Sequence, residues 1–518
     1  MSSTRPPSSQ PPAFTEPEPG EISVSDTQDF RPPPPGEFLG HPKGLWMLFG
    51  SEFWERFMYY GMRAILAPYV AMAFFAHLGE GAEEQASLTY GGYTAMVYMT
   101  GIAGGYVADR ILGYQRSIML GGAMMSVGMV MLLAPDLTTF LIGLGVVVVG
   151  NGLFKPNIST MVGKLYAPGD VRRDSGFTIF YMGINAGAFL APIVCGSIIG
   201  ALYGFRWGFF AAGMGMILGL IVFQVLKGWI GHVGEVPADK KGYGPLLQVL
   251  VGAGLLVIPV FFLLSRSDIL GVLLLAMMGA LIVYFIYSGF ASKDKVQLHR
   301  YIAMLILFLA NTVFWSLFEQ AGSSLNFFAR DYVDMPFGLN FTIFQSANPV
   351  FILLLAPVFA WMWPRLDNKG INPSIPRKFS LGLIGVAVGF YALVFSIQFM
   401  QDADGRVPAL MLTLCYLLHT MGELCLSPIG LSMVTKLARP KEVGLAMGGW
   451  FLSIAMANYL AGLIAAFAAG GGGALDAAAG SVEGYAKVFG QLFWFGLGAG
   501  VFFLVVAPLI NRLMHGVK

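Results

Sequence analysis

The chain has 518 residues, of which 56% are hydrophobic and only 12% are charged, and its formal net charge is +2. This balance, with a mean hydropathy of +0.68, excludes an ordinary soluble domain and indicates that lipid is the main solvent. The small net charge argues against a nucleic-acid partner, whose phosphates would need a clustered basic face.

Residues 1–43 open the chain with a stretch rich in Pro, Ser and Glu. They lack the basic and then apolar order of a cleavable signal peptide. Their composition is typical of segments that do not fold on their own. We therefore expect a disordered cytoplasmic tail before the membrane-embedded part of the chain.

Fourteen apolar segments follow, each about 20 residues or longer, which is the length that a helix needs to cross a hydrocarbon core of roughly 30 Å. The expected fold is therefore an all-α polytopic membrane protein with fourteen transmembrane helices. The segments lie near 46–76, 88–109, 114–134, 137–163, 174–199, 204–226, 243–264, 269–291, 300–329, 341–363, 379–400, 408–436, 443–469 and 486–512.

Basic residues gather in every second loop. Because Lys and Arg near helix ends are retained in the cytoplasm, these loops and both termini are predicted to lie inside. The alternate loops carry acidic residues, such as Glu83 and Glu84, or a Gly/Ala run near 470–480. The basic residues are Arg110, Arg116, Lys164, Arg172, Arg173, Lys227, Lys240, Lys241, Lys293, Lys295, Arg300, Arg365, Lys369, Arg377, Lys378, Lys436, Arg439, Lys441, Arg512 and Lys518.

The seventh and eighth segments have almost no polar residue over 246–264 and 270–285. They are predicted to form a lipid-facing hairpin in a linker at 229–297, between a six-helix bundle at 44–228 and another at 298–518. Two pseudo-symmetric bundles around a central cavity would support alternating access. Composition alone leaves open a helical bundle without transport, such as an assembly scaffold or a membrane enzyme.

The first segment carries Glu52, Glu55, Arg56 and Arg63 within an apolar helix. Each such charge costs about 2.5–3.5 kcal/mol at the bilayer centre and is tolerated only toward a cavity or a partner. At about 100° per residue, these charges fall with Tyr59 and Tyr60 within roughly 140° of arc. They form one polar stripe, which is predicted to line the interior of the protein.

Three more segments carry one isolated charge each, namely Lys155, Glu319 and Glu423. Counting about 1.5 Å per residue from the helix ends places Arg63 and Glu319 in the outer half of the membrane, and Lys155 and Glu423 in the inner half. We therefore predict two opposite-charge pairs at two depths, Arg63 with Glu319 and Lys155 with Glu423, as a carrier with two gates would need. Static pairs that only orient helices are the alternative.

Several long motifs in register resemble one known family. The most specific is EFWERFMYYG, which begins at Glu52 and is similar to a helix-1 signature. GGYVADRILGYQRS, GNGLFKPNIST, GFTIFYMGINAGAFLAP, FQSANPVFI and ELCLSPIGLSMVTKLARP follow in the same order as in that family. Residues 44–514 thus resemble the proton-dependent oligopeptide transporters of the major facilitator superfamily, and the extra hairpin is typical of bacterial members.

The resemblance implies a role for each polar residue of the site. A guanidinium fork and an ammonium suit a carboxylate, and aromatic faces accept varied side chains. The peptide carboxylate would contact Tyr59, Arg63 and Lys155. The free amine would contact Asn185, Asn348 and Glu319. The side chains of the peptide would contact Tyr98, Trp315 and Trp450. The expected substrate site also includes Tyr60, Glu423 and Ser427. The expected proton-coupling site consists of Glu52, Glu55, Arg56 and Glu319.

Two positions depart from the family's pattern. Animal members are associated with a histidine on the second helix, and the segment 88–109 contains none, so coupling should rest on carboxylates with protons as the coupling ion and no cofactor. Phe318 precedes Glu319 where some bacterial relatives carry a second acid. His419, about one turn before Glu423, either tunes that carboxylate or packs as a satisfied histidine.

The resulting expectation is a proton-coupled importer of dipeptides and tripeptides, acting as a monomer in the lipid of a bacterial inner membrane. A major facilitator carrier of nitrate or of a drug-like compound is the alternative, although nitrate would have less use for Glu319 and two asparagines. An enzyme is not expected, because no GxSxG, HExxH or phosphate loop stands in a convincing context. Cys195, Cys415 and Cys425 are expected to be buried free thiols rather than metal ligands.

Overall fold

The computed structural model describes residues 31–79, 81–236, 242–469 and 481–517, most of which are helical. Helices occupy all fourteen segments that the sequence predicts. Within the described residues, 11 helices are long and apolar enough to cross a membrane. α2 (Lys43–Phe74), which carries the charged stripe, is not among them. The chain is a polytopic helical membrane protein, and the number of fourteen crossings stays a prediction.

Three groups of helices follow one another along the chain. The first contains α2, η1 (Ala76–Leu78), α3 (Gly81–Val107), the π-helix η2 (Ala108–Leu112), α4 (Tyr114–Met131), α5 (Leu137–Lys164), α6 (Arg172–Ala191), the π-helix η3 (Pro192–Gly200), α7 (Ala201–Tyr203), α8 (Phe205–Val225) and η4 (Lys227–Trp229). The second is a hairpin of α9 (Gly244–Ser265) and α10 (Ser267–Ala291). The third contains α11 (Lys295–Phe318), η6 (Glu319–Gly322), α12 (Ser324–Tyr332), η7 (Pro336–Gly338), η8 (Phe341–Ser346), α13 (Ala347–Asn368), α14 (Ile375–Phe399), α15 (Ala409–Leu437), α16 (Val443–Ala468) and α17 (Val482–Leu513).

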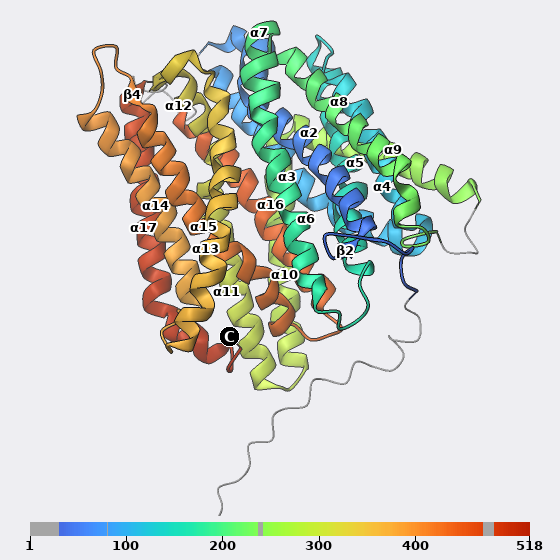
Figure 1. Cartoon of the computed structure of the whole chain (residues 1–518). Helices are drawn as coiled ribbons and strands as arrows, with labels where there is room; N and C mark the ends of the chain where they lie inside the picture. The colour runs from blue at the N-terminus through green and yellow to red at the C-terminus, as the bar shows by residue number, and fades with distance from the viewer. Residues whose placement is uncertain (1–30, 80, 237–241, 470–480, 518) are drawn as a thin grey trace, which may run out of the picture.

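The hairpin touches both of the other groups. α9 packs against α3 and α5, whereas α10 packs mainly against α11 and α16. The first group lies on one side of the molecule and the third on the other, as the blue-to-green and yellow-to-red halves of Figure 1 show. These contacts agree with two bundles bridged by a hairpin, although the exact division at 44–228, 229–297 and 298–518 stays a prediction.

Several predicted helices change their winding along their length, and two of these changes lie at polar residues or proline within the segment. The segment predicted as one helix over 300–329 becomes α11, the 3₁₀ turn η6 and α12, with Ser323 at φ −128° and ψ −96° before α12. The segment near 174–199 turns from α6 into η3 at Pro192, which has no N–H to continue the ladder. The first break matters most, because it places Glu319 at the end of α11.

The end of the predicted tail is structured. Residues 1–30 lie outside the described part of the chain, but β1 (Glu37–Phe38) pairs antiparallel with β2 (His41–Pro42). The Arg172 guanidinium binds the Glu37 carboxylate at 2.7 Å, and the His41 ring hydrogen-bonds the Tyr166 hydroxyl at 2.8 Å. The prediction of disorder up to residue 43 was therefore wrong for residues 37–42, because contacts with distant helices outweigh local composition.

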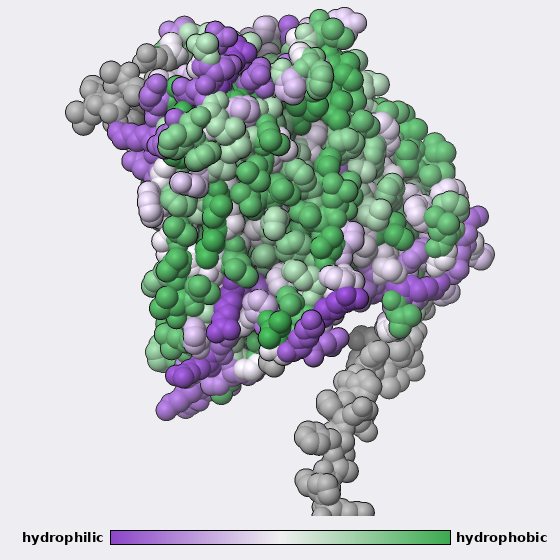
Figure 2. Space-filling view, turned by 60° about the vertical axis from the view of Figure 1, so that its left-hand side comes forward, coloured by the Kyte–Doolittle hydropathy of each residue, from purple (hydrophilic) through white to green (hydrophobic). Residues whose placement is uncertain are grey.

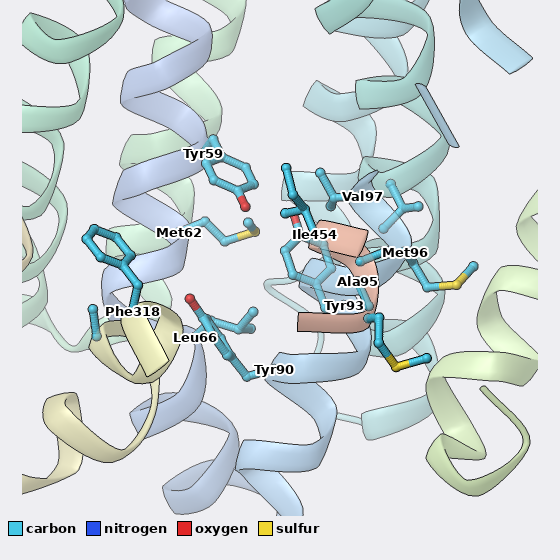
Figure 3. Packing of buried hydrophobic residues seen from close by; sticks show 14 of the residues in the cluster. Tyr59, Met62, Leu66, Tyr90, Tyr93, Ala95, Met96, Val97, Phe318 and Ile454 are labelled. Atoms are coloured by element: carbon cyan, nitrogen blue, oxygen red, sulfur yellow. The ribbon is translucent and has the colours of Figure 1, made fainter. Parts of the chain in front are cut away.

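The two bundles meet closely along α3 and α16. A Cβ built on Gly91 would lie 2.7 Å from the Gly462 Cα, so only small residues allow this approach. The neighbouring core is aromatic and apolar: Figure 3 shows Tyr59 of α2 near Tyr90 and Tyr93 of α3. This packing places α2, the helix with the charged stripe, against α3 beside the contact between the two bundles.

The outer surface of the molecule matches a bilayer. Figure 2 shows a broad hydrophobic belt between two hydrophilic ends. Exposed apolar side chains on α8, α9, α10 and α17, such as Phe210, Leu255, Val283 and Val505, contribute to the lipid-facing surface. The described ends of the chain, near β2 and after α17, lie toward the same end of the molecule (Figure 1).

Candidate functional site

A buried ion cluster lies on one face of α2. The Arg56 Nε donates to Glu55 Oε2 and lies 3.2 Å from Glu52 Oε1. All three residues are buried, as the predicted polar stripe requires. Two carboxylates therefore share one guanidinium in a site shielded from solvent.

A neighbouring helix completes this cluster. Asn151 of α5 donates its amide N–H to Glu55 Oε1 at 3.0 Å. Asn151 lies in the GNGLFKPN motif, and sequence analysis singled out only Lys155 there. Because the two residues are four positions apart on one helix, they share a face, and that spacing was the available signal.

The second ion pair joins the two bundles. Arg63 Nη2 of α2 binds Glu319 Oε2 at 2.5 Å, and Arg63 Nε donates to the Tyr90 hydroxyl of α3 at 2.6 Å. The structure thus brings together the pair predicted for the outer gate. Tyr90 was missed because a tyrosine among apolar residues gives no sign of its partner.

The other predicted pair is not formed in this conformation. Lys155 Nζ lies 5.0 Å from the ring centroid of Tyr98. Glu423 instead accepts a hydrogen bond of 2.8 Å from Asn348, which also donates to Thr420 Oγ1 at 3.0 Å. The ion pairs found among the described residues do not include Lys155 with Glu423. Thr420 was another residue that sequence analysis did not name.

The remaining predicted substrate residues lie in different environments. Tyr59 and Tyr60 form an edge-to-face pair on α2, with the Arg56 and Arg63 guanidinium groups over their respective rings at 5.3 and 5.8 Å. Asn185 donates to the Tyr181 carbonyl in its own helix. Trp315 and Ser427 are half-buried, while Trp450 is buried against Phe308 and Phe379. Trp450 therefore acts as a packing residue in this conformation.

The hydrogen bonds of His419 are with its own helix and α14, and among the described residues none of them is to Glu423. Its Nε2 hydrogen-bonds the Val386 carbonyl at 3.1 Å, and its ring packs 4.9 Å from that of Phe390. These contacts join α15 to α14 and favour the interpretation of His419 as a packing histidine.

One end of the molecule is closed by contacts between the bundles. Asn326 of α12 donates to the Ala64 carbonyl of α2 at 2.9 Å, and Ser346 donates to the Phe189 carbonyl of α6 at 2.7 Å. Arg330 of α12 forms an ion pair with Glu83 of α3. Loop charges predict this end to be the outer one, so the structure is closed on the predicted outer side.

This geometry is that of a helical membrane carrier. One group of buried charges lies within the first bundle, and another joins the two bundles. A family model described as the POT family matches residues 115–477, and the chain belongs to that family of transporters. It is therefore a transporter and not an enzyme.

Curated relatives align over nearly the whole chain. The uncharacterized transporter YclF of Bacillus subtilis is 37% identical over 96% of this chain and 99% of its own length. The peptide transporter YePEPT of Yersinia enterocolitica is 38% identical over 82% of this chain and 88% of its own length. The dipeptide and tripeptide permease B of Edwardsiella piscicida is 34% identical, with coverages of 92% and 97%.

Solved structures give the same family. The crystal structure of a peptide transporter POT in complex with sulfate has a TM-score of 0.79 and 37% identity, covering 95% of this chain and 100% of that one. A POT family transporter in complex with 5-aminolevulinic acid has a TM-score of 0.76 and 31% identity, with coverages of 94% and 100%.

Proposed function

We propose that the chain is a proton-coupled symporter that imports dipeptides and tripeptides by alternating access. The observation that carries this proposal is the buried cluster in which Glu52 and Glu55 share Arg56. A buried carboxylate whose charge is only partly compensated gains affinity for a proton. Such a group can take up a proton on one side of the membrane and release it on the other.

The charge balance of the buried site supports one exchangeable proton. The four carboxylates face only three cations, so the site has one excess negative charge before a proton binds. A zwitterionic peptide adds no net charge. The acids are Glu52, Glu55, Glu319 and Glu423, and the cations are Arg56, Arg63 and Lys155.

The substrate would be held by both of its ends. Arg63 and Lys155, with Tyr59, suit the peptide carboxylate. Glu319, with Asn185 and Asn348, suits the free amine. A nitrate carrier would gain nothing from this acidic half of the site, which favours peptides over nitrate. Tyr60, Tyr98, Trp315, Ser427 and Trp450 would adjust the pocket to different side chains.

The two predicted charge pairs would act as gates. Here Arg63 and Glu319 are joined, whereas Lys155 and Glu423 have other neighbours. Pairing on one side and separation on the other is the state expected when the outer gate is closed. A peptide carboxylate on Arg63, or a proton on Glu319, would remove one partner of the outer pair and bias the conformational equilibrium.

We further propose a bacterial inner-membrane location, with both termini in the cytoplasm, fourteen crossings in a six, two, six arrangement, and a monomeric unit. The alternating basic loops and the bacterial relatives support this topology.

Uptake of a labelled dipeptide into proteoliposomes tests the proposed substrate and its driving force. An inwardly directed pH gradient should raise accumulation well above equilibration, and a protonophore should abolish the excess. A dipeptide acetylated at its amine and amidated at its carboxyl should compete at least tenfold more weakly, because it lacks both charges that the site would hold. Equal competition by the blocked peptide would exclude the two-ended site.

A further inference from the structure

Glu55 is the better-held carboxylate of the α2 cluster. Its Oε2 accepts from Arg56 Nε, and its Oε1 accepts from Asn151 Nδ2 at 3.0 Å. Glu55 is 0% exposed and Asn151 is 2% exposed. Both oxygens of this carboxylate therefore have a protein donor, and neither depends on bulk water.

Glu52 is held on one side only. Its Oε1 lies 3.2 Å from Arg56 Nε, but its Oε2 has no hydrogen-bond partner among the described residues. Glu52 is 1% exposed, so water does not freely replace the missing donor. The two carboxylates thus share one guanidinium, but Glu55 has a direct hydrogen bond from Arg56 and a second from Asn151, whereas among the described residues Glu52 has only the ion pair at 3.2 Å.

We propose that Asn151 is a positioning residue that keeps Glu55 ionised and thereby makes Glu52 the carboxylate that takes up the coupling proton. An amide N–H that donates to a carboxylate stabilises its charged form. A protonated carboxyl keeps some acceptor capacity, but it has no negative charge for the donors to stabilise, so two donors favour the ionised form over the neutral one. This inference rests on the proposed proton symport and identifies the residue that assigns the proton within the cluster.

Within the described part of the chain, the other groups around the cluster donate no hydrogen bond that distinguishes the two carboxylates. Tyr93 of α3 lies near Glu55, but its hydroxyl has no hydrogen-bond partner among the described residues, and the positive charge of Lys155 on α5 acts on both carboxylates. On the other side, α6 and α8 approach through Gly187 and Gly219. Besides the guanidinium that both carboxylates contact, Asn151 is therefore the described neighbour that distinguishes Glu55 from Glu52 by a hydrogen bond.

Infrared titration of the protein in lipid can test this inference without transport. The carbonyl stretch of protonated carboxyls is followed against pH, and the contribution of the cluster is the difference between each protein and the same protein with Glu52→Gln and Glu55→Gln. Asn151→Leu removes the donor at similar volume. It should raise the midpoint of this band by about one pH unit, a roughly tenfold higher proton affinity, because a hydrogen bond to a charged group is lost.

Two further variants make the result specific. Asn157→Leu is the matched control, because Asn157 is equally buried on α5 but donates only to the Gly104 and Leu153 carbonyls. It should leave the midpoint unchanged. In a Glu55→Gln background, where the charge is gone, Asn151→Leu should cause no further shift.

The inference would be overturned by an unchanged midpoint in Asn151→Leu, by an equal shift in Asn157→Leu, or by a shift that persists with Glu55→Gln. Peptide uptake provides the separate readout for symport. A separate outcome is that the midpoint shifts as expected while peptide uptake by the wild type does not depend on the pH gradient. That result would support the positioning role of Asn151 and would contradict the proposed proton coupling.

Discussion

The intramembrane charges differ in the neighbours that hold them. Glu55 has two donors, whereas Arg63 is shared between Glu319 and Tyr90. Lys155 faces the Tyr98 ring, and Glu423 accepts from a neutral amide. Lys155 and Glu423 therefore break no ion pair of the described residues when they move. We expect these two residues to form a new pair with each other when the conformation changes.

The first prediction concerns Glu52. Glu52→Gln should abolish pH-driven accumulation of peptide while preserving part of the counterflow exchange, because exchange needs substrate binding but no net proton movement. The measurement is labelled-dipeptide uptake with and without a pH gradient. Glu84→Gln, in the first turn of α3 and outside the cluster, should behave as the wild type. Accumulation that persists in Glu52→Gln would show that another group carries the proton.

The membrane charges could be predicted to this level from the sequence because charge in an apolar helix is rare and must face inward. The angular spacing on α2 grouped Glu52, Glu55 and Arg56 correctly on one face. Depth counting brought Arg63 and Glu319 together. Neither method could reveal Asn151 or Tyr90, since the partner of a neutral polar side chain depends on packing between distant helices.

At the scale of elements, the sequence predicts which segments are helical but not where a helix is interrupted. All fourteen apolar segments are helical, because length and hydropathy determine which segments can cross a bilayer. The 3₁₀ turn at Glu319–Gly322 was not visible, since its residues are compatible with an α-helix. α3 begins at Gly81, before the predicted start at 88, with Glu83 and Glu84 in the first turn, where acidic side chains suit the helix dipole.

One carboxylate adds hydrogen bonds to the packing between the extra hairpin and the third group of helices. Glu442, the residue before α16, accepts from Tyr284 and Ser288 of α10 at 3.1 and 2.6 Å, and from Tyr301 of α11. Burial alone would raise the pKa of Glu442, but these three hydroxyl donors lower it below its usual range. The contact therefore involves the charged form of the carboxylate and connects the hairpin to the loop between α15 and α16.

The second prediction follows from this contact. Glu442→Gln should lower the unfolding temperature in detergent at pH 7 by about 2 °C, because a charged acceptor is replaced. A lowered pKa in the folded state means that the stabilisation is complete above about pH 4.3, the unfolded value, and is lost as the pH falls below it. The difference between variant and wild type should thus shrink in acid.

Glu483→Gln is the control for that measurement. Glu483 is an exposed residue in the first turn of α17 and has no hydrogen bond to α10. Glu483→Gln should lower the unfolding temperature at pH 7 by less than Glu442→Gln does. A Glu442→Gln protein as stable as the wild type at pH 7 would show that the hairpin is held by apolar packing alone.

On the scale of the whole molecule, the predicted outer end is closed by several layers. The ion pair of Arg330 with Glu83 lies roughly 10 Å outward of the Arg63 pair, counted along α3 from Tyr90 to Glu83. The Gly91 and Gly462 contact brings α3 and α16 together at the level of the Arg63 pair, next to Tyr90. The outer closure therefore combines charge with close helix packing, and opening it requires the two bundles to move as units.

The third prediction concerns the two gates. Glu319→Gln should widen distances between spin labels at the outer ends of α2 and α12, because it removes the partner of Arg63. Glu423→Gln should increase the inward-open fraction, because Lys155 then has no carboxylate to meet when the inner side closes. Each change should shift the conformational ratio by about tenfold per roughly 1.4 kcal/mol lost. Unchanged distance distributions in both variants would identify the pairs as static struts.

The central claim is that peptide and proton cross the membrane together, and the most direct test runs the coupling in reverse. Proteoliposomes are loaded with a pH-sensitive dye, and an unlabelled dipeptide is added outside with no pH gradient. Since coupling is reciprocal, the peptide gradient should acidify the lumen, and a doubly blocked dipeptide should not. Entry of labelled dipeptide with no change in lumenal pH would contradict the account.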